Sequence, residues 1–229
     1  MRTAVGLCLA AVCLDGAAQA SGEEFLSLFN GENLDGWTVS DENPGSFIVE
    51  DGMIKTRGPR AHLFYTGPVN GADFRNFEFR ADVRTLPGSN SGIYFHTEYQ
   101  AEDWPAKGFE AQINNAGVDP RRTGGLYNVA DIYVPRETDP KFAVRYMGTE
   151  IQVSRDASPV RDGEWFEYAI MVRDRTIEVR IDGETLVIWT EPEGWPRPGR
   201  RIDSGTFALQ AHDPNSEVHF RDLRVRVLD

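Results

Sequence analysis

The amino-acid sequence predicts an all-β protein, with two antiparallel sheets packed face to face as a β-sandwich or jelly roll. Apolar and polar residues alternate with the period of a strand over many short runs, as in residues 77–84 and 176–181. Turn signals such as Asp51-Gly52 and Asp182-Gly183 separate these runs. No stretch of about 10 or more residues carries a convincing helical period.

The individual strands follow from the same alternation. Asp51-Gly52, Asp174-Arg175 and Asp182-Gly183 each predict a hairpin turn between neighbouring runs. Pro87-Gly88 ends another run and predicts that residues 91–97 form the hairpin partner of residues 77–84. Strands are therefore expected at residues 47–50, 53–55, 77–84, 91–97, 109–114, 167–173, 176–181, 185–189, 205–212 and 218–228.

Three other segments predict long loops. Residues 98–107 contain Trp104-Pro105, residues 116–140 contain several Arg, Gly and Pro, and residues 191–201 are rich in Pro and Gly. Long loops on a β scaffold often carry function. No linker, composition shift or internal repeat divides residues 21–229, which are therefore expected to form one domain.

Residues 1–20 have the pattern of a secretory signal peptide. Met1-Arg2-Thr3 gives a basic start, residues 4–14 form an apolar run, and Ala18-Gln19-Ala20 fits a small-x-small cleavage site. The apolar run is shorter than the about 20 residues that span a bilayer, so no membrane span is expected. After cleavage near Ala20, the chain is expected to be periplasmic or secreted.

Cysteine content and net charge disfavour several classes of function. Both cysteines, Cys8 and Cys13, lie in the predicted signal peptide, which leaves none for a disulfide, a thiolate zinc site or a cysteine nucleophile. The formal net charge of -12 at pH 7 disfavours nucleic acid and anionic membrane surfaces as partners. Neutral glycans, or neutral or cationic small molecules, are the expected ligands.

Two strands far apart in the sequence each carry reactive polar side chains on one face. Glu110 and Gln112 share a face of the first, and Gln210 and His212 share a face of the second. Ordinary polar-out patterning would also place polar residues at these positions, but a solvated face normally carries Lys, Thr, Ser and Arg. Glu, Gln and His repeated on one face favour a binding or catalytic site.

The other histidines differ in what their contexts predict. His96 shares a strand face with Tyr94 and is expected to line a cleft. His219 alternates with apolar neighbours and is expected to be structural or solvent-facing. His62 follows a loop-like segment and carries no clear signal. No two histidines have a local metal-binding spacing.

An ordinary glycosidase would use two carboxylates about 5–10 Å apart, and the sequence does not favour that arrangement. Glu110 is the only carboxylate on its strand, where Gln112 and Asn114 occupy the next positions on the same face. A partner from elsewhere, such as Asp131 or Asp213, remains open.

Several motifs follow one another in a fixed order along nearly the whole mature chain. They include residues 28–37, Asn90-Ser91-Gly92-Ile93-Tyr94-Phe95, Gly108-Phe109-Glu110-Ala111-Gln112-Ile113, Thr123-Gly124-Gly125-Leu126-Tyr127 and Leu209-Gln210-Ala211-His212. In this ordered set the chain resembles the 3-keto-disaccharide hydrolase domain family, long known as a domain of unknown function. The resemblance implies a concanavalin A-like or laminin G-like jelly roll.

The resemblance also implies an enzyme that cleaves 3-keto-glycosides or 3-keto-disaccharides, and the predicted signal peptide implies that this enzyme is exported. A ketone at C3 acidifies the C2 proton, so a base can remove it, the C1 substituent can leave by elimination, and water can then add. Glu110 and His212 are the expected catalytic acid and base, in either order. The expected substrate-binding residues are Asn90, Tyr94, His96, Gln112, Tyr127 and Gln210. A divalent cation held by Glu110 and His212 would be an alternative way to polarise the ketone.

Three positions depart from the family pattern: Ala211 replaces the usual Asp, Asp213 the usual Gly, and His96 a common Arg. The first two flank the expected catalytic region, where a difference in substrate or activity would arise. A non-catalytic carbohydrate-binding, lectin-like module on the same fold is the main alternative, with exposed Trp104 and Trp195 as sugar-stacking platforms. An ordinary glucanase is the third.

Overall fold

The computed structural model describes residues 24–116, 121–133, 145–146, 149–150, 152–155 and 159–229. The expected signal peptide, residues 1–20, lies outside these ranges, as does part of the expected loop at residues 116–140. Within the described ranges, no helix is long and apolar enough to cross a membrane.

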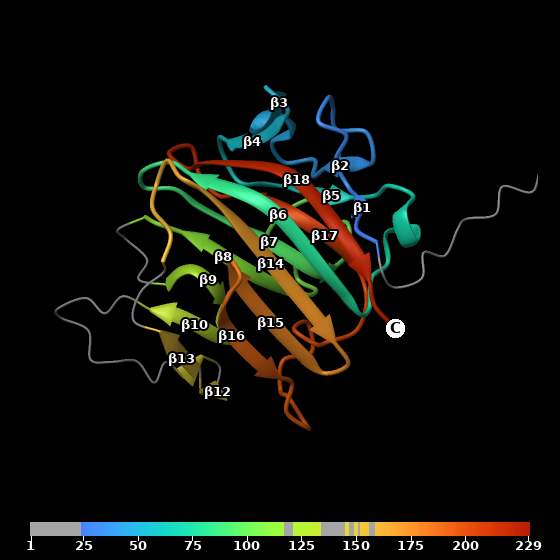
Figure 1. Cartoon of the computed structure of the whole chain (residues 1–229), viewed down its shortest axis with the longest axis vertical. Helices are drawn as coiled ribbons and strands as arrows, with labels where there is room; N and C mark the ends of the chain where they lie inside the picture. The colour runs from blue at the N-terminus through green and yellow to red at the C-terminus, as the bar shows by residue number, and fades with distance from the viewer. Residues whose placement is uncertain (1–23, 117–120, 134–144, 147–148, 151, 156–158) are drawn as a thin grey trace, which may run out of the picture.

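Two large sheets, drawn one behind the other in Figure 1, make up the structure. The first contains, in spatial order, β16 (Glu184–Thr190), β15 (Thr176–Ile181), β14 (Trp165–Arg173), β6 (Phe77–Thr85), β18 (Glu217–Val227), β4 (Met53–Arg57) and β3 (Phe47–Glu50), with β1 (Leu26–Ser27) paired to β18. The second contains β13 (Gln152–Arg155), β10 (Ala130–Tyr133), β9 (Arg121–Leu126), β8 (Phe109–Asn114), β7 (Asn90–Thr97), β17 (Thr206–Ala211), β5 (Ala61–Tyr65) and β2 (Trp37–Val39).

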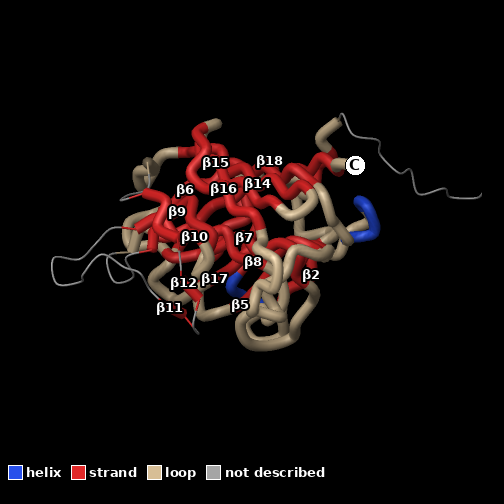
Figure 2. Tube along the Cα trace, turned by 90° about the horizontal axis from the view of Figure 1, so that it is seen from below, coloured by secondary structure: helices blue, strands red, loops and turns tan. Residues whose placement is uncertain are grey.

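The remaining regular elements are small. Strands β11 (Arg145–Tyr146) and β12 (Thr149–Glu150) pair with each other, and η1 (Pro44–Ser46) and η2 (Val69–Ala72) are short 3-10 segments. Figure 2 shows how strands dominate the described chain. Within the described residues, the strand pairs are antiparallel except β10 with β13. The all-β, two-sheet prediction is confirmed.

The core lies between the two sheets and is built by the predicted alternation. In β6, Phe77 and Phe79 face inward, and in the opposite sheet Phe207 meets them with ring centroids 4.9 and 4.8 Å away. Such aromatic pairs add about 0.5–1.5 kcal/mol each beyond the area they bury. The inward positions of β7 and β8 are likewise mostly apolar, which leaves their alternate positions on the outer face of the second sheet.

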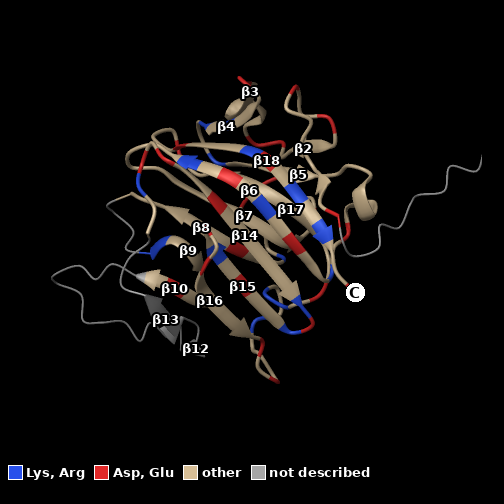
Figure 3. Ribbon diagram, viewed as in Figure 1, with Lys and Arg blue, Asp and Glu red and all other residues tan. Residues whose placement is uncertain are grey.

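The outer face of the first sheet is a lattice of opposite charges. Arg80 bonds both Glu78 and Glu167, Arg224 also bonds Glu167, and Arg226 bonds Glu78. Figure 3 shows these alternating basic and acidic residues along β6, β14 and β18. The charges neutralise one another across the strands, so this face has the character of a solvated surface.

The hairpin turns behave as their residues predict. Asp51 and Gly52 have φ angles of 53° and 73°, and Asp182 and Gly183 have 49° and 78°. Two successive positive φ angles match the twist of antiparallel strands, and Asp-Gly adopts them at low cost. Strand β3 therefore pairs with β4, and β15 pairs with β16, as expected.

The expected hairpin between residues 77–84 and 91–97 is wrong. Strand β6 pairs with β14 and β18, whereas β7 pairs with β8 and β17 in the other sheet. The short connection between them crosses from sheet to sheet, and Leu86 N and Ser89 Oγ both donate to the carbonyl of Glu217, at 3.1 and 2.6 Å. Alternation shows that a strand has a buried face, but it does not show which sheet the strand joins.

The expected loop at residues 116–140 is also wrong in part, because it contains β9 and β10. Its glycines suggested a loop, but they serve close packing within a strand. A Cβ on Gly124 would lie 2.4 Å from Leu186 Cδ1, and one on Gly125 would lie 2.9 Å from Ile132 N. The expected loops at residues 98–107 and 191–201 carry no strand in the structure.

His62, which the sequence placed in a loop-like segment, lies instead in the central part of β5 and is fully buried. Neither ring nitrogen has a hydrogen-bond partner among the described residues. Burial lowers the pKa of His62 to about 4 from an ordinary value near 6.5. As the pH falls from about 6.5 to about 4, His62 therefore becomes protonated in the unfolded state but stays neutral in the folded state.

This asymmetry predicts that His62 makes the fold acid-sensitive. The free energy of unfolding should fall by about 3 kcal/mol across that window because of His62 alone. His62→Phe keeps a buried ring and removes the titration, so its stability should fall less than that of the wild type. Urea unfolding at pH 7 and at pH 4.5 measures the difference, and parallel losses in the two proteins would contradict it.

Candidate active site

A pocket of about 680 Å³ lies on the outer face of the second sheet, over β7, β8 and β17. Its floor comes from alternate positions of these strands, and its walls come from the turn between β9 and β10 and from two loops. The lining residues are Asn90, Tyr94, Trp104, Ala106, Glu110, Gln112, Arg121, Tyr127, Asn128, Pro196, Arg197, Pro198, Gly199, Arg200, Gln210 and His212. Seven of the eight residues expected from the sequence are among them; His96 is not.

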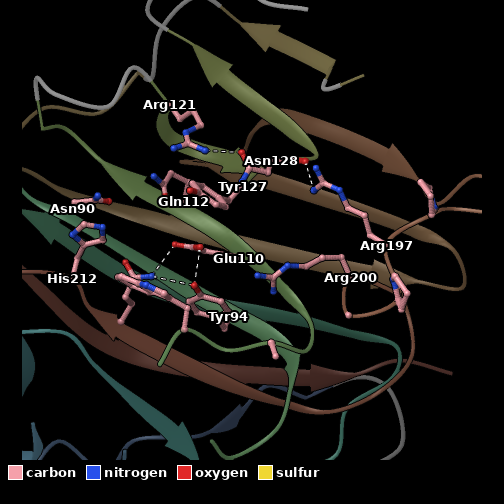
Figure 4. Close-up of a pocket in the computed structure, with 16 residues that line it drawn as sticks. Asn90, Tyr94, Glu110, Gln112, Arg121, Tyr127, Asn128, Arg197, Arg200 and His212 are labelled. Atoms are coloured by element: carbon pink, nitrogen blue, oxygen red, sulfur yellow. Dashed lines mark hydrogen bonds between the residues drawn. The ribbon is translucent and has the colours of Figure 1, made fainter. Parts of the chain in front are cut away.

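Glu110 lies in the floor, at the centre of a hydrogen-bonded group (Figure 4). Tyr94 lies opposite it on β7 and donates its hydroxyl to Glu110 Oε2 at 2.8 Å. Gln210 donates from Nε2 to Glu110 Oε1 at 3.0 Å and to the Tyr94 hydroxyl at 3.2 Å. Burial raises the pKa of Glu110, and the bonds from Tyr94 and Gln210 and the nearby charge of Arg200 only partly oppose it. A carboxyl group in this setting can hold and release a proton.

Gly92 provides the space in which the Glu110 side chain lies. It precedes Tyr94 by two positions on the same face of β7, opposite Gln112 on β8. A Cβ at this position would lie 2.5 Å from Glu110 Oε1 and 2.8 Å from its Cγ. The absence of a side chain at Gly92 therefore fixes where the carboxyl group sits.

Gly92→Ala is expected to displace Glu110 without unfolding the chain. The φ angle of Gly92 is not in the left-handed range, so alanine fits the backbone and the Glu110 side chain, from Cγ outward, must move. A shift of about 1 Å in a catalytic group costs about 10²-fold in rate. Steady-state kinetics should show that loss, with an unchanged melting temperature. Gly45→Ala, where an added Cβ meets nothing within 4 Å, is the matched control.

His212 directly follows β17 and is oriented by its neighbour. Its Nδ1 lies 2.9 Å from Asp213 Oδ2, and Ser216 Oγ and Asn215 N also donate to the Asp213 carboxylate. Burial opposes ionisation of Asp213, but the bonds from Ser216, His212 and Asn215 outweigh it and leave its pKa below the usual value. An ionised Asp213 holds the proton of the imidazole on Nδ1, which leaves Nε2 unprotonated and able to act as a base.

His96 lies outside the pocket because a bulge interrupts the alternation of β7. Pairing with β17 shifts between Thr206 and Ala208, and His96 has a φ angle of 52°. The bulge removes His96 from the face of Tyr94 and buries it, with Nε2 2.9 Å from the carbonyl of Arg75. The structure gives His96 no contact with the site expected from the sequence.

Three buried amide oxygens in the floor have no hydrogen-bond partner among the described residues. They are Asn90 Oδ1, Gln112 Oε1 and Gln210 Oε1. Buried polar atoms normally have a partner, so unsatisfied acceptors in a pocket indicate that a ligand or water supplies donors. Sugar hydroxyl groups are such donors.

The two tryptophans proposed as exposed platforms differ in position. Trp104 lines the pocket, is 38% exposed, and lies with its ring centroid 5.2 Å from that of His212. Arg60 stacks on the Trp104 ring at 5.1 Å and bonds Asp103, which holds the tip of this loop. Trp195 is instead buried, 5.0 Å from Trp189, so its expected exposure is wrong.

Three arginines that line the pocket are not among the residues expected from the sequence. Arg121 lies over the Tyr127 ring, 4.2 Å from its centroid, and bonds Asn128 Oδ1 at 2.6 Å. Arg197 and Arg200 come from the loop between β16 and β17. Residues 196–200 contain two prolines and two arginines in an expected functional loop, which was the only signal in the sequence.

Glu110 is the only carboxylate among the lining residues of the described chain. Asp131, one of the two possible partners from the sequence, accepts from the backbone N–H of Asn128 at 3.1 Å, and Asp213 holds His212. In the described ranges, no three His, Cys, Asp or Glu side chains come together as metal ligands. Both oxygens of Glu110 accept hydrogen bonds, from Tyr94 and Gln210. A carboxylate that binds a divalent cation turns its oxygens toward the cation, so the surroundings of Glu110 do not match such a site.

The fold and the pocket first define a class: a concanavalin-like β-sandwich with a polar pocket on the outer face of one sheet. Within this class, the chain belongs to the family described as the 3-keto-alpha-glucoside-1,2-lyase-like domain, which matches residues 24–226. It is 25% identical over 236 residues to the 3-keto-disaccharide hydrolase of Bacteroides thetaiotaomicron, and this match covers 90% of the chain and 79% of that protein. The family expected from the ordered motifs is confirmed.

Solved structures share the fold. A candidate glycosyl hydrolase from Parabacteroides distasonis has a TM-score of 0.64 and 22% identity, with 95% of this chain and 99% of that chain covered. A galectin-like protein of unknown function from Bacillus subtilis has a TM-score of 0.58 and 10% identity, with 93% and 99% covered. At these identities the likeness shows the fold alone, which agrees with the expected jelly roll.

Proposed function

We propose that this protein cleaves glycosides whose sugar has been oxidised to a ketone at C3. Its family and its relative from Bacteroides thetaiotaomicron support this substrate class. The observation that carries the proposal is the pairing of one buried carboxyl group of raised pKa, Glu110, with one oriented imidazole, His212, in a pocket that no other carboxylate of the described residues lines. This pairing suits proton transfer better than the two-carboxylate hydrolysis of ordinary glycosidases.

His212 acts as the base in the first step. Its Nε2 removes the proton from C2, which the neighbouring ketone makes acidic, and the electron pair moves to the C3 oxygen as an enolate. Asp213 stabilises the imidazolium that forms, because its carboxylate accepts the Nδ1 proton at 2.9 Å. Donors from the amides of Asn90 and Gln112 in the floor stabilise the enolate oxygen.

Glu110 acts as the acid in the elimination. The enolate collapses to a C1–C2 double bond, the C1–O bond breaks, and Glu110 gives its proton to the leaving oxygen. Burial raises the pKa of Glu110, so the carboxyl group keeps this proton to a higher pH than an exposed glutamate does. Tyr94 and Gln210 hold the carboxylate that results.

Hydration then reverses the roles of the two groups. The Glu110 carboxylate takes a proton from water, the oxygen of that water bonds to C1, and the imidazolium of His212 returns a proton to C2. The products are the free 3-keto sugar and the former leaving group, and both side chains regain their starting protonation states. Tyr127 and Trp104 in the walls offer ring faces for the sugar.

A panel of glucosides and their 3-keto forms tests the proposal, with and without a chelator. We expect turnover of the 3-keto forms alone. Binding of unoxidised glycan without turnover of any 3-keto-glycoside would instead favour a lectin-like module, for which the exposed ring of Trp104 would be a platform. Cleavage of ordinary glucosides at comparable rates would favour a glucanase.

A further inference from the structure

One end of the pocket is strongly cationic, although the chain has a net charge of -12. Arg197 and Arg200 line this end, and Arg121 lines the pocket from β9, against Glu110 as the only acidic lining residue in the described chain. The raised pKa of Glu110 favours its neutral form, which increases the imbalance. The net charge of the chain led us to expect neutral or cationic ligands, whereas the positive charge at this end of the pocket favours an anionic group.

Backbone carbonyls hold two of these guanidinium groups in position. Arg200 Nη1 donates to Gly108 O at 2.7 Å, and Arg197 Nη1 donates to Asn128 O at 2.6 Å. Arg200 forms no ion pair with any described residue, whereas elsewhere Arg80 and Arg180 are paired with carboxylates. A carbonyl fixes the geometry of a guanidinium group without cancelling its charge, so the positive charge of Arg200 stays directed at the pocket.

The loop that carries Arg197 and Arg200 is also preorganised. Its buried Trp195 donates from Nε1 to Arg200 O at 2.7 Å and packs against Trp189. The carboxylate of Glu191 accepts from Ile202 N at 2.7 Å and from Arg201 Nε at 3.1 Å, which closes the base of the loop. Little conformational entropy is then lost when a ligand binds these arginines.

We propose that this end of the pocket binds a carboxylate on the leaving part of the glycoside, such as that of a uronic acid. The proposal rests on the function proposed above, in which Glu110 protonates the leaving oxygen. Figure 4 shows His212 on one side of Glu110 and Arg197 on the other. With C2 at His212 and the glycosidic oxygen at Glu110, the leaving group extends toward the arginines. The planar guanidinium groups of these arginines match a carboxylate in shape and charge.

The direct test compares two substrates that differ only in charge: a 3-keto-glucosyl glucuronate and its glucuronamide. We expect kcat/KM to be at least about tenfold higher for the acid, the effect of one charge-assisted hydrogen bond. The ratio should fall as ionic strength rises. Equal kcat/KM values for the acid and the amide in the wild type would overturn the proposal.

Variants assign the preference to the arginines. Arg197→Gln and Arg200→Gln should each bring the acid-to-amide ratio toward one, while Arg197→Lys should retain part of it because the charge remains. The ratio is the readout, so a general loss of activity in either variant does not affect it. A preference that persists unchanged in both glutamine variants, with circular dichroism showing folded protein, would overturn the assignment.

Binding measurements separate this proposal from the proposed function. Calorimetric titration with the unoxidised glucosyl glucuronate and its amide needs no turnover. Tighter binding of the acid, lost in Arg200→Gln, supports the carboxylate site even if no 3-keto substrate is cleaved. Turnover of neutral 3-keto-disaccharides without any preference for the acid, in kinetics or binding, would leave the proposed function standing and overturn the carboxylate site alone.

Discussion

Glu110→Gln is expected to lower kcat/KM for a 3-keto-disaccharide by about 10²–10⁴-fold, the usual contribution of a general acid. Glutamine keeps the shape of the side chain and its amide oxygen can accept one of the two hydrogen bonds that Tyr94 and Gln210 donate to Glu110, but it has no proton to give to the leaving oxygen. The loss should depend on the leaving group. A 3-keto 4-nitrophenyl glucoside, whose phenolate leaves without protonation, should retain most of its rate, and kcat/KM for both substrates measures the difference.

The pH profile and the stability of Glu110→Gln provide its controls. Burial raises the pKa of Glu110, so the catalytic acid form is lost as the pH rises through that raised value. The wild-type profile should show this descending limb, and the variant should lack it. Because ionising the buried group costs stability above its unfolded-state pKa, the variant should melt at the same or a higher temperature at neutral pH. Equal losses for both leaving groups would contradict the role of Glu110 as the acid.

His212→Ala is expected to cause a loss of similar size, about 10²–10⁴-fold, for both leaving groups. Removal of the C2 proton precedes departure of any leaving group, so a better leaving group cannot rescue this variant. Asp213→Asn should also lower the rate, because it leaves the imidazole in place but removes the carboxylate that sets its tautomer.

Exchange of the C2 hydrogen in D₂O isolates this step from the rest of the reaction. Glu110→Gln should still exchange the C2 hydrogen of a 3-keto-glycoside, because its base is intact, whereas His212→Ala should not. Nuclear magnetic resonance of the recovered substrate measures the exchange. Undiminished exchange in His212→Ala, with the melting temperature preserved, would exclude His212 as the base.

Much of the fold could be predicted because alternation and turn chemistry are local. Asp51-Gly52 and Asp182-Gly183 form the turns that their residues favour. The pairing of β6 could not be predicted in the same way, since the choice of β14 and β18 over β7 depends on contacts distant in sequence. The prediction of a loop at residues 116–140 was partly wrong for the same reason, because Gly124 packs against Leu186, which is distant in sequence.

The floor of the site could be predicted because its residues keep the strand period. Glu110, Gln112 and Gln210 lie on one face and line one pocket, as their spacing indicated. The same strand period placed His96 on the face of Tyr94, and this prediction is wrong. A bulge turns His96 to the other face, and no residue pattern in the sequence indicates that bulge. Arg197 and Arg200 lie in a loop, where no periodicity applies, and Arg121 begins a strand in a segment that the sequence indicated as a loop.

The burial of β8 and β17 along their whole length has a consequence for how this site can change. Amides in the middle of such strands exchange with solvent only when much of the protein opens, so Glu110 and Gln210 share the rigidity of the core. Arg197 and Arg200 belong to the loop between β16 and β17, where their side chains can be substituted without changing a strand. Substitutions near Glu110 that affect proton transfer will therefore also affect the stability of the fold. Substitutions of Arg197 and Arg200 can change which leaving group is preferred without that cost.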